Sequence, residues 1–148
     1  MKFLNFLGSS HLTSNHGLPQ ALKRHYSELD PLFKSKYCIK LIEGCPGATY
    51  NNEQFLDQFL KDVKNQTSDI DHEGQVNIIM LGSNDTRELT SLPADLLKQG
   101  LEKFEFKVKK FIEDLLCIKN STIILLSIII PREINCCLTD CILEELVR

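Results

Sequence analysis

Short apolar runs alternate along the chain with segments in which apolar residues recur at helical spacing. The apolar runs occupy residues 3–7, 37–42, 75–81 and 122–130. Apolar residues at intervals of three and four follow each run, within 18–29, 55–63, 96–115 and 134–146. Continuous apolar runs favour strands, and the longer spacing favours amphipathic helices. Strands that alternate with helices predict an α/β fold, in which a parallel sheet has helices on both faces.

Turn and capping residues mark where these elements begin and end. Asp30-Pro31 closes the first predicted helix, and Asn51 or Asn52 can cap the second. Pro131 stops the last predicted strand, Thr122–Ile130. Because that strand is apolar almost throughout rather than at alternate residues, we expect both of its faces to be covered.

The composition is that of an ordinary globular protein, and it disfavours several classes of partner. The chain has 148 residues, 43% of them apolar, and a net charge of -3, so we expect one domain spanning 1–148. A weakly negative chain gives no electrostatic case for binding nucleic acid or an anionic membrane. No apolar run reaches the ~20 residues that cross a bilayer, and residues 1–7 are too few for a secretory signal. A cytoplasmic protein is therefore expected.

The six cysteines do not predict a metal site. Cys38 and Cys117 fall in apolar, periodic segments, and we expect both to be buried. Cys137 and Cys141 would share a helix face, but a metal there would need partners that the nearby sequence does not show. Reduced thiols are the favoured interpretation, and neither a metal nor another cofactor is expected.

Small and polar residues follow the first three predicted strands. They form Gly8-Ser9-Ser10, Gly44-Cys45-Pro46-Gly47-Ala48-Thr49 and Gly82-Ser83-Asn84-Asp85. In a sheet ordered 2-1-3-4 these loops are neighbours, at the carboxyl edge where such folds bind ligands. A serine hydroxyl, a backbone N–H beside a glycine and an asparagine amide supply most of an acyl-transfer site. The alternative is that these residues only make turns and cap helices.

The three motifs, in this order, resemble those of the SGNH, or GDSL-type, hydrolases. Gly82-Ser83-Asn84-Asp85 matches the family's Gly-x-Asn-Asp, and residues 44–49 are similar to its glycine-rich second turn. Gly8-Ser9-Ser10 resembles the family's Gly-Asp-Ser with Ser9 in place of aspartate, and residues 128–132 resemble its fourth strand and exit. The resemblance spans nearly the whole chain. It implies a three-layer α/β/α, flavodoxin-like fold with a parallel sheet.

The resemblance also implies roles for individual residues. Ser10 would be the nucleophile, and the Gly47 N–H and the Asn84 amide would be the oxyanion donors. The substrate would be a small carboxylic ester or acyl compound. The supporting residues would be Gly8, Ser9, Gly82 and, holding its own turn together, Asp85.

The chain departs from the family's pattern at the catalytic base. Family members supply a histidine from an Asp-x-x-His loop after a fifth strand, but this sequence has no histidine after His72. Asp69-Ile70-Asp71-His72 has the right letters but precedes the third strand, which puts His72 ~20 Å from Ser10 as a solvated loop residue. His11 and His16 follow Ser10 closely, and neither is expected to act as the base. His25 is expected to be exposed on a helix.

A sheet without a fifth strand has a structural consequence. The domain would be C-terminally incomplete, with Thr122–Ile130 at an open edge of the sheet. Unpaired backbone groups on an apolar edge strand favour association with another chain. The sequence therefore predicts self-association through this strand.

Three functions remain open at this point. The first is an ester hydrolase, either active with a base from elsewhere or descended from an active enzyme. The second is an inactive binding module that holds an acyl, acetyl or phosphate group in the same pocket. The third is a flavodoxin-like nucleotide binder, which is disfavoured because the first loop has neither Gly-x-x-x-x-Gly-Lys nor Gly-x-Gly-x-x-Gly.

Overall fold

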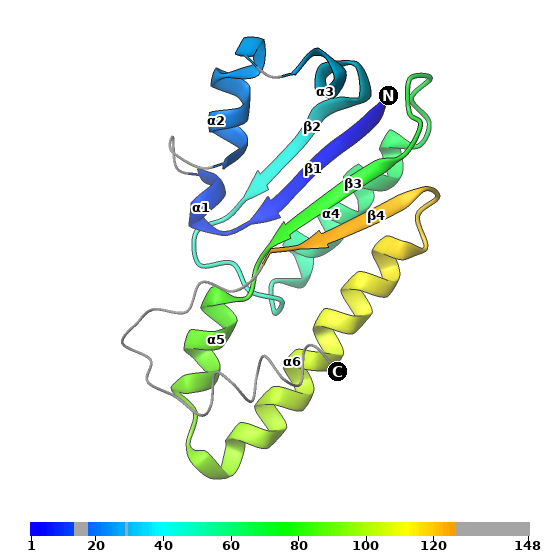
Figure 1. Cartoon of the computed structure of the whole chain (residues 1–148). Helices are drawn as coiled ribbons and strands as arrows, with labels where there is room; N and C mark the ends of the chain where they lie inside the picture. Colours follow the sequence, from blue (N-terminus) through cyan, green and yellow to red (C-terminus); the bar gives the residue numbers. More distant parts are fainter. Residues whose placement is uncertain (14–17, 29, 127–148) are drawn as a thin grey trace.

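A four-stranded parallel sheet with helices on both faces forms the framework of the protein (Figure 1). The computed structural model describes residues 1–13, 18–28 and 30–126. The strands are β1 (Lys2–Gly8), β2 (Tyr37–Gly44), β3 (Gln75–Met80) and β4 (Ser121–Leu125). The helices are α1 (Ser10–Thr13), α2 (Leu18–Arg24), the 3₁₀ helix η1 (Tyr26–Glu28), α3 (Pro31–Lys36), α4 (Glu53–Gln66), α5 (Ser83–Thr90) and α6 (Ala94–Leu116).

The strand order is β2-β1-β3-β4, and every neighbouring pair is parallel. The chain moves from β1 to β2 in one direction, then passes back over β1 to β3 and β4. Because crossovers between parallel strands are right-handed, this reversal puts α1–α3 on one face and α4 and the second half of α6 on the other (Figure 1). The predicted three-layer α/β fold with order 2-1-3-4 is confirmed.

Two apolar cores follow from this arrangement. Side chains that alternate along β1 point to opposite faces, so Phe6 lies in one core and Leu7 in the other. Leu12 of α1 packs on the Phe6 side. On the Leu7 side the sheet is covered by α4 and α6, through Leu56, Phe59, Val63, Phe104, Val108, Phe111 and Leu115.

A row of amides crosses the sheet and fixes its register. Asn5 and Asn77 are paired across β1 and β3, and both are fully buried. Asn5 Nδ2 donates to Gln66 Oε1 at 2.8 Å and to Asn77 Oδ1 at 3.0 Å, while Asn5 Oδ1 accepts from Gln66 Nε2 at 2.7 Å. Asn77 Nδ2 in turn donates to Ser121 Oγ on β4 at 2.9 Å. A shift of one residue would leave these buried groups unpaired, which costs about 1–3 kcal/mol for each.

The segment between β1 and β2 differs from the prediction. One helix was expected over 18–29, closed by Asp30-Pro31, but α2 ends at Arg24 and η1 and α3 follow. Asp30 is the N-cap of α3, and its carboxylate accepts the Leu32 N–H at 2.7 Å. Asp30-Pro31 therefore starts a helix here, because proline is tolerated in a first helical turn.

The edge strand β4 differs as well. Its predicted range was 122–130, and it was expected to be covered on both faces. In the part that the structure describes, β4 pairs with β3 alone, and Ile124 and Leu125 are 44% and 50% exposed. Among the described residues β4 is therefore at the edge of the sheet, and its exposed Ile124 and Leu125 differ from the expected cover on both faces. Residues 127–130 and Pro131 lie outside the described part.

Three smaller predictions also have an outcome. Cys117 is exposed and Cys38 is half-buried, so the expectation that both are buried is wrong. The N-cap of α4 is Asn52, but its side chain accepts the Thr49 N–H at 2.8 Å instead of capping the helix. Within residues 1–13, 18–28 and 30–126, no helix is long and apolar enough to cross a membrane. The helix predicted over 134–146, with Cys137 and Cys141, lies outside the described residues.

Candidate functional site

The ends of β1, β2 and β3 lie level at the carboxyl edge of the sheet. Gly8 pairs with Gly44 on one side and with Met80 on the other. Just beyond the strands, the Cys45 N–H donates to the Gly8 carbonyl at 3.1 Å. The three loops that the sequence singled out therefore start side by side, with the loop after β1 between the other two.

The first exit turns directly into a short helix. Ser9 is 2% exposed, whereas Ser10 is exposed and is the first residue of α1. A side chain at Gly8 would come within 3.0 Å of Leu12 and 3.1 Å of Met80 Cβ, so only glycine fits without a shift. This close approach brings α1 down onto the strand ends and presents Ser10 at the surface.

The second exit is a tight turn that contains Gly47. The Ala48 N–H donates to the Cys45 carbonyl at 3.1 Å, with Pro46 and Gly47 in the central positions. Gly47 has a φ of 75°, which the third residue of a type II turn requires and which glycine adopts freely. A Cβ at Gly47 would meet no atom within 4 Å, so the conformation rather than the space demands glycine.

The third exit is a helix start rather than a loop. Gly82 has a φ of 121° and is the N-cap of α5, so Ser83, Asn84 and Asp85 are the first turn of that helix. The sequence was interpreted as a turn because four small or polar residues follow a strand. The helix is visible only in retrospect, from the spacing of the buried Asp85 and Leu89 along it.

Asn84 connects the third exit to the second. Its Nδ2 donates to the Ala48 carbonyl at 3.2 Å, in the loop that carries Gly47. An amide nitrogen carries two hydrogens, so this bond orients the amide and leaves one hydrogen for a further acceptor. The structure thus brings two of the three predicted site residues into one bonded unit, beside the exit that leads to Ser10.

Asp85 makes the second connection between these exits. Its Oδ1 accepts the Tyr50 N–H at 2.9 Å, so Asp85 holds the loop after β2. The sequence analysis had instead expected Asp85 to hold its own turn together. Asp85 is 4% exposed, and burial raises the pKa of its carboxyl to about 6, while the Tyr50 N–H acts in the opposite direction. The buried Asp85 side chain therefore links α5 to the loop after β2.

The histidines with described side chains lie away from this edge. His72 precedes β3, whose first residue Gln75 pairs with Phe3 at the amino edge of the sheet. Its ring bonds to Gln75 and meets the Phe3 ring edge-on at a centroid distance of 5.2 Å, so it is half-buried rather than solvated. His25 is exposed, as predicted, and pairs with Glu28 at 3.0 Å. His16 lies outside the described part of the chain.

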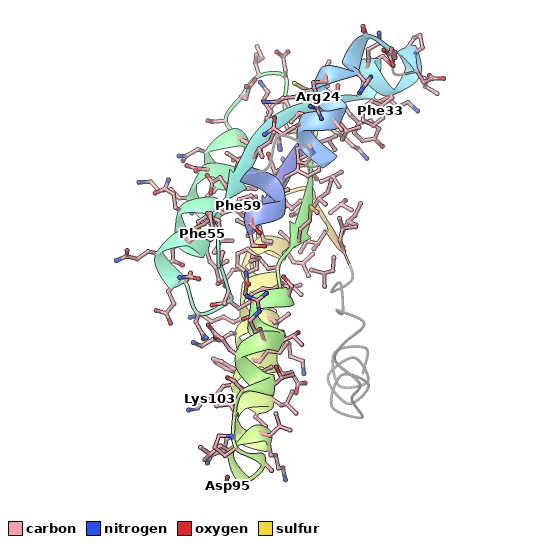
Figure 2. All side chains as sticks on the ribbon, turned by 90° about the vertical axis from the view of Figure 1, so that its left-hand side faces the viewer. Arg24, Phe33, Phe55, Phe59, Asp95 and Lys103 are labelled. Atoms are coloured by element: carbon pink, nitrogen blue, oxygen red, sulfur yellow. The ribbon has the colours of Figure 1, made fainter. Side chains whose placement is uncertain are left out.

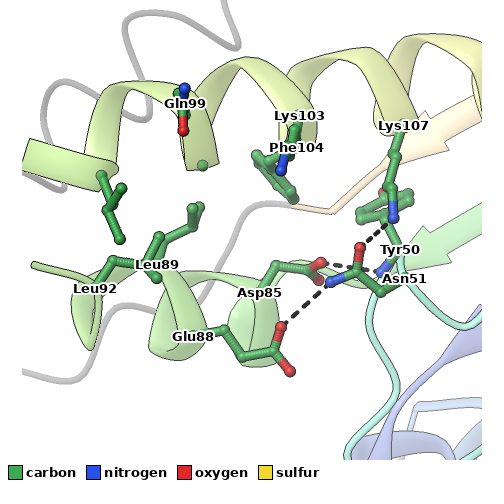
Figure 3. A pocket seen from close by; sticks show the side chains of 12 residues that line it. Tyr50, Asn51, Asp85, Glu88, Leu89, Leu92, Gln99, Lys103, Phe104 and Lys107 are labelled. Atoms are coloured by element: carbon green, nitrogen blue, oxygen red, sulfur yellow. Dashed lines mark hydrogen bonds between the residues drawn. The ribbon is translucent and has the colours of Figure 1, made fainter.

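Beyond the carboxyl edge, α5 and the first half of α6 project together as a helical pair (Figures 1 and 2). A cavity of about 320 Å³ lies between them and is closed at one end by Tyr50 and Asn51 (Figure 3). Sequence reasoning missed this cavity, although Gly100 inside a helical pattern was a signal for close helix packing. Ser10, Gly47 and Asn84 do not line it. The lining residues are Tyr50, Asn51, Asp85, Glu88, Leu89, Leu92, Leu96, Gln99, Gly100, Lys103, Phe104 and Lys107.

Comparison with known proteins gives one structural relative. No protein-family model and no curated protein matches the sequence. The fold is similar to the crystal structure of the psychrotrophic esterase EstA from Pseudoalteromonas sp. inhibited by monoethylphosphonate, with a TM-score of 0.63. The likeness covers 99% of this chain and 70% of the esterase, at 14% sequence identity. The chain therefore has an α/β fold similar to that of an esterase.

Proposed function

We propose that this chain carries the nucleophile and the oxyanion site of a carboxylic ester hydrolase of the SGNH, or GDSL, type. Ser10 is the nucleophile in this proposal, and the Gly47 N–H and the Asn84 amide are the oxyanion donors. The observation that carries the proposal is the hydrogen bond from Asn84 to Ala48, because it joins the asparagine to the glycine turn at the strand edge from which Ser10 emerges. The esterase-like fold supports the same function.

The chemistry assigns each group a separate task. Ser10 Oγ attacks the ester carbonyl carbon, and the electron pair of the C=O bond moves onto the oxygen. Asn84, with the amide hydrogen that Ala48 does not take, and the Gly47 N–H stabilise that oxyanion; one such donor contributes about 10²–10³ in rate. The tetrahedral intermediate collapses, the alcohol leaves with the proton from Ser10, and water then hydrolyses the acyl-enzyme.

The supporting residues act on the conformation of the loops and helix starts at the strand ends. Gly8 permits α1 to approach the strand ends, and Gly82 supplies the φ that starts α5 directly after β3. Asp85 fixes the loop that carries Gly47, through Tyr50. Ser9 is buried at the place where the family has aspartate. These four residues hold the geometry and do not touch the substrate.

A second function is favoured by the position of the histidines. A serine hydroxyl needs a base to accept its proton. Neither His72 nor His25, the histidines whose side chains are described, lies at the carboxyl edge. A binding module that holds an acyl, acetyl or phosphate group on Asn84 and the Gly47 N–H, without cleaving it, fits that observation.

Phosphonylation separates the two functions. A fluorophosphonate should modify Ser10 of the wild-type protein slowly, and added imidazole should accelerate the reaction by acting as the base. Ser10→Ala should carry no adduct, Asn84→Ala should react about 10²-fold more slowly, and the control His72→Ala should react like the wild type. The measurement is intact mass over time with peptide mapping.

The binding module predicts a different pattern. Ser10 then stays unmodified even with imidazole, and butyrate or methylphosphonate binds reversibly in a calorimetric titration. Asn84→Ala should abolish that binding while Ser10→Ala should only weaken it. Modification of Ser10 at equal rates in the wild type and in Asn84→Ala would contradict the oxyanion role in both functions.

A further inference from the structure

The cavity between α5 and α6 has the size and the walls of a small-ligand site. Its volume of about 320 Å³ falls at the lower end of the range for such sites, about 300–1,000 Å³. A Cβ at Gly100 would lie 2.6 Å from Leu92 Cδ1, in the connection between the helices, and 3.0 Å from Leu89 Cδ2 on α5, so this glycine leaves room for both leucines in the wall. The apolar walls come from Leu89, Leu92, Leu96 and Phe104.

Asp85 lines this cavity and has a buried carboxylate oxygen beneath the surface of the lining. Its Oδ1 accepts the Tyr50 N–H, but no group in the described part of the chain donates a hydrogen bond to its buried Oδ2. A buried acceptor without a donor costs about 1–3 kcal/mol, and more when it is charged. Burial raises the pKa of the Asp85 carboxyl to about 6, although the backbone N–H groups of Tyr50 and Asp85 act in the opposite direction. A donor brought by a ligand would remove this cost.

The charges around the cavity balance. Asp85 and Glu88 contribute two acids from α5, and Lys103 and Lys107 contribute two bases from α6. The lining as a whole therefore gives neither a cation nor an anion a net electrostatic attraction. A neutral molecule avoids desolvating a charge of its own, and its apolar part can contact the leucines.

We propose that the cavity binds a small neutral molecule with an apolar body and one O–H or N–H group, which donates to Asp85 Oδ2. The apolar body contacts Leu89, Leu92, Leu96 and Phe104. The donor satisfies the buried oxygen while Oδ1 keeps its bond to Tyr50. Alcohols and primary amides are the chemical classes that meet both conditions.

Asn51, Glu88 and Lys107 form a side-chain bridge in the same lining as Asp85. Asn51 donates to Glu88 Oε2 at 3.4 Å and accepts from Lys107 Nζ, and both bonds are exposed (Figure 3). Asp85 Oδ2 has almost no solvent-accessible surface, so a ligand reaches it by displacing a covering side chain. Exposed polar contacts of this kind are worth at most about 1 kcal/mol, so Asn51 can move aside at a small cost in free energy.

The proposed catalytic residues Ser10, Gly47 and Asn84 do not line the cavity. Tyr50, Leu89 and Phe104 belong to the apolar core that packs against α4 and α6. Ser10 begins α1, which packs through Leu12 on the other face. In Figure 2, Lys103 lies on the side of the helical pair where α4 is found. This inference therefore stands whether or not Ser10 acts as a nucleophile.

An isomer pair tests the proposal. Benzyl alcohol and anisole have the same atoms, but only benzyl alcohol carries an O–H donor. Each is titrated into the ¹⁵N-labelled full chain, with the Tyr50 amide resonance as the reporter because Tyr50 donates to Asp85. We expect saturable shifts at Tyr50 and an affinity for benzyl alcohol about tenfold higher than for anisole, as for a hydrogen bond to a charged group.

Variants show whether Asp85 causes the preference. Asp85→Asn keeps an acceptor for Tyr50 and replaces Oδ2 by a donor, so benzyl alcohol and anisole should bind equally. Gly100→Ala forces Leu92 to shift and should weaken both ligands, which gives a second test if Asp85→Asn does not fold. Asp95→Asn, on α6 but outside the lining, should behave like the wild type. Equal binding of the isomers to the wild type, or no shift at Tyr50, would overturn the proposal.

Discussion

The polar side chains inside the sheet and those at its carboxyl edge differ in how completely they are hydrogen-bonded. Asn5, at the centre of β1, uses both amide hydrogens and its oxygen, in bonds to Gln66 and Asn77. Asn84, at the edge, uses one hydrogen, in its bond to Ala48. Asp85 has an oxygen to which no group in the described part of the chain donates.

This difference separates residues with a structural role from residues that can bind a ligand. A saturated buried amide can only hold the strands in register, because any exchange of partner breaks bonds that it already makes. An edge residue with a remaining donor or acceptor is held in place by one bond and can offer the other to a ligand. The two asparagines share a chemistry but have different tasks.

Replacing Asn5 and Asn84 by alanine, one at a time, should give the largest difference in stability between the two regions. Asn5→Ala removes three hydrogen bonds from a fully buried site and should lower the free energy of unfolding by about 3–4 kcal/mol. Asn84→Ala removes one part-buried bond and should cost about 1 kcal/mol. Urea unfolding followed by circular dichroism measures both. Equal losses would show that Asn84 is as structural as Asn5.

The pH dependence of stability should show the incomplete bonding of Asp85. Burial raises its pKa from 3.8 to about 6, so the folded state holds the proton more tightly than the unfolded state. Stability from this group is therefore present at low pH and is lost as the pH rises from about 4 to about 6. The loss is at most about 3 kcal/mol, because one pKa unit corresponds to about 1.4 kcal/mol.

Asp85→Asn isolates that contribution. The variant has no proton to lose, so its free energy of unfolding should not show the fall between pH 4 and pH 6 that Asp85 causes. Glu43 affects stability in an overlapping pH range, since burial and the neighbouring Asp62 raise its pKa to about 8. Its effect is common to both proteins and cancels in their difference. A difference that stays constant from pH 4 to pH 7 would mean that Asp85 is not perturbed.

The histidine at the amino edge should matter least. His72 bonds to Gln75 and contacts Phe3, so His72→Ala should cost about 1 kcal/mol of stability. It should leave the phosphonylation of Ser10 unchanged, because the two residues lie at opposite ends of the sheet. Thermal unfolding and intact-mass kinetics measure the two effects. A slower reaction at Ser10 in this variant would mean that the Asp-x-x-His sequence before β3 does act at the site.

Much of the fold could be predicted from the sequence, because strands and helices have different periods. The runs at 3–7, 37–42 and 75–81 became β1, β2 and β3, and the parallel order followed from their alternation with helices. The segment after Arg24 was missed, since η1 and α3 are too short to show a period. The exposure of Ile124 was missed because an apolar run does not say how many faces are covered.

The glycine turn after β2 was predictable from the sequence, but the hydrogen bonds at the strand ends were not. Gly47 could be assigned to a turn from its neighbour Pro46, and it adopts the φ that the turn needs. The partner of Asp85 could not be found, because Tyr50 is 35 residues away and contributes only its backbone N–H. The cavity was missed for a similar reason, since its walls come from two helices and a loop that meet only in the folded chain.

Ester turnover with and without an added base tests the central claim. The claim is that Ser10 lies at an oxyanion site and that neither His25 nor His72, the histidines whose side chains are described, lies beside it. The substrate is p-nitrophenyl acetate, and the proteins are the wild type, Ser10→Ala and, as a check on the local histidine, His16→Ala. Without imidazole we predict equal rates for all three, and with imidazole a faster rate for the wild type and His16→Ala than for Ser10→Ala. A wild type that exceeds Ser10→Ala without imidazole would show that the chain already has a base, and equal rates under both conditions would show that Ser10 is not a nucleophile.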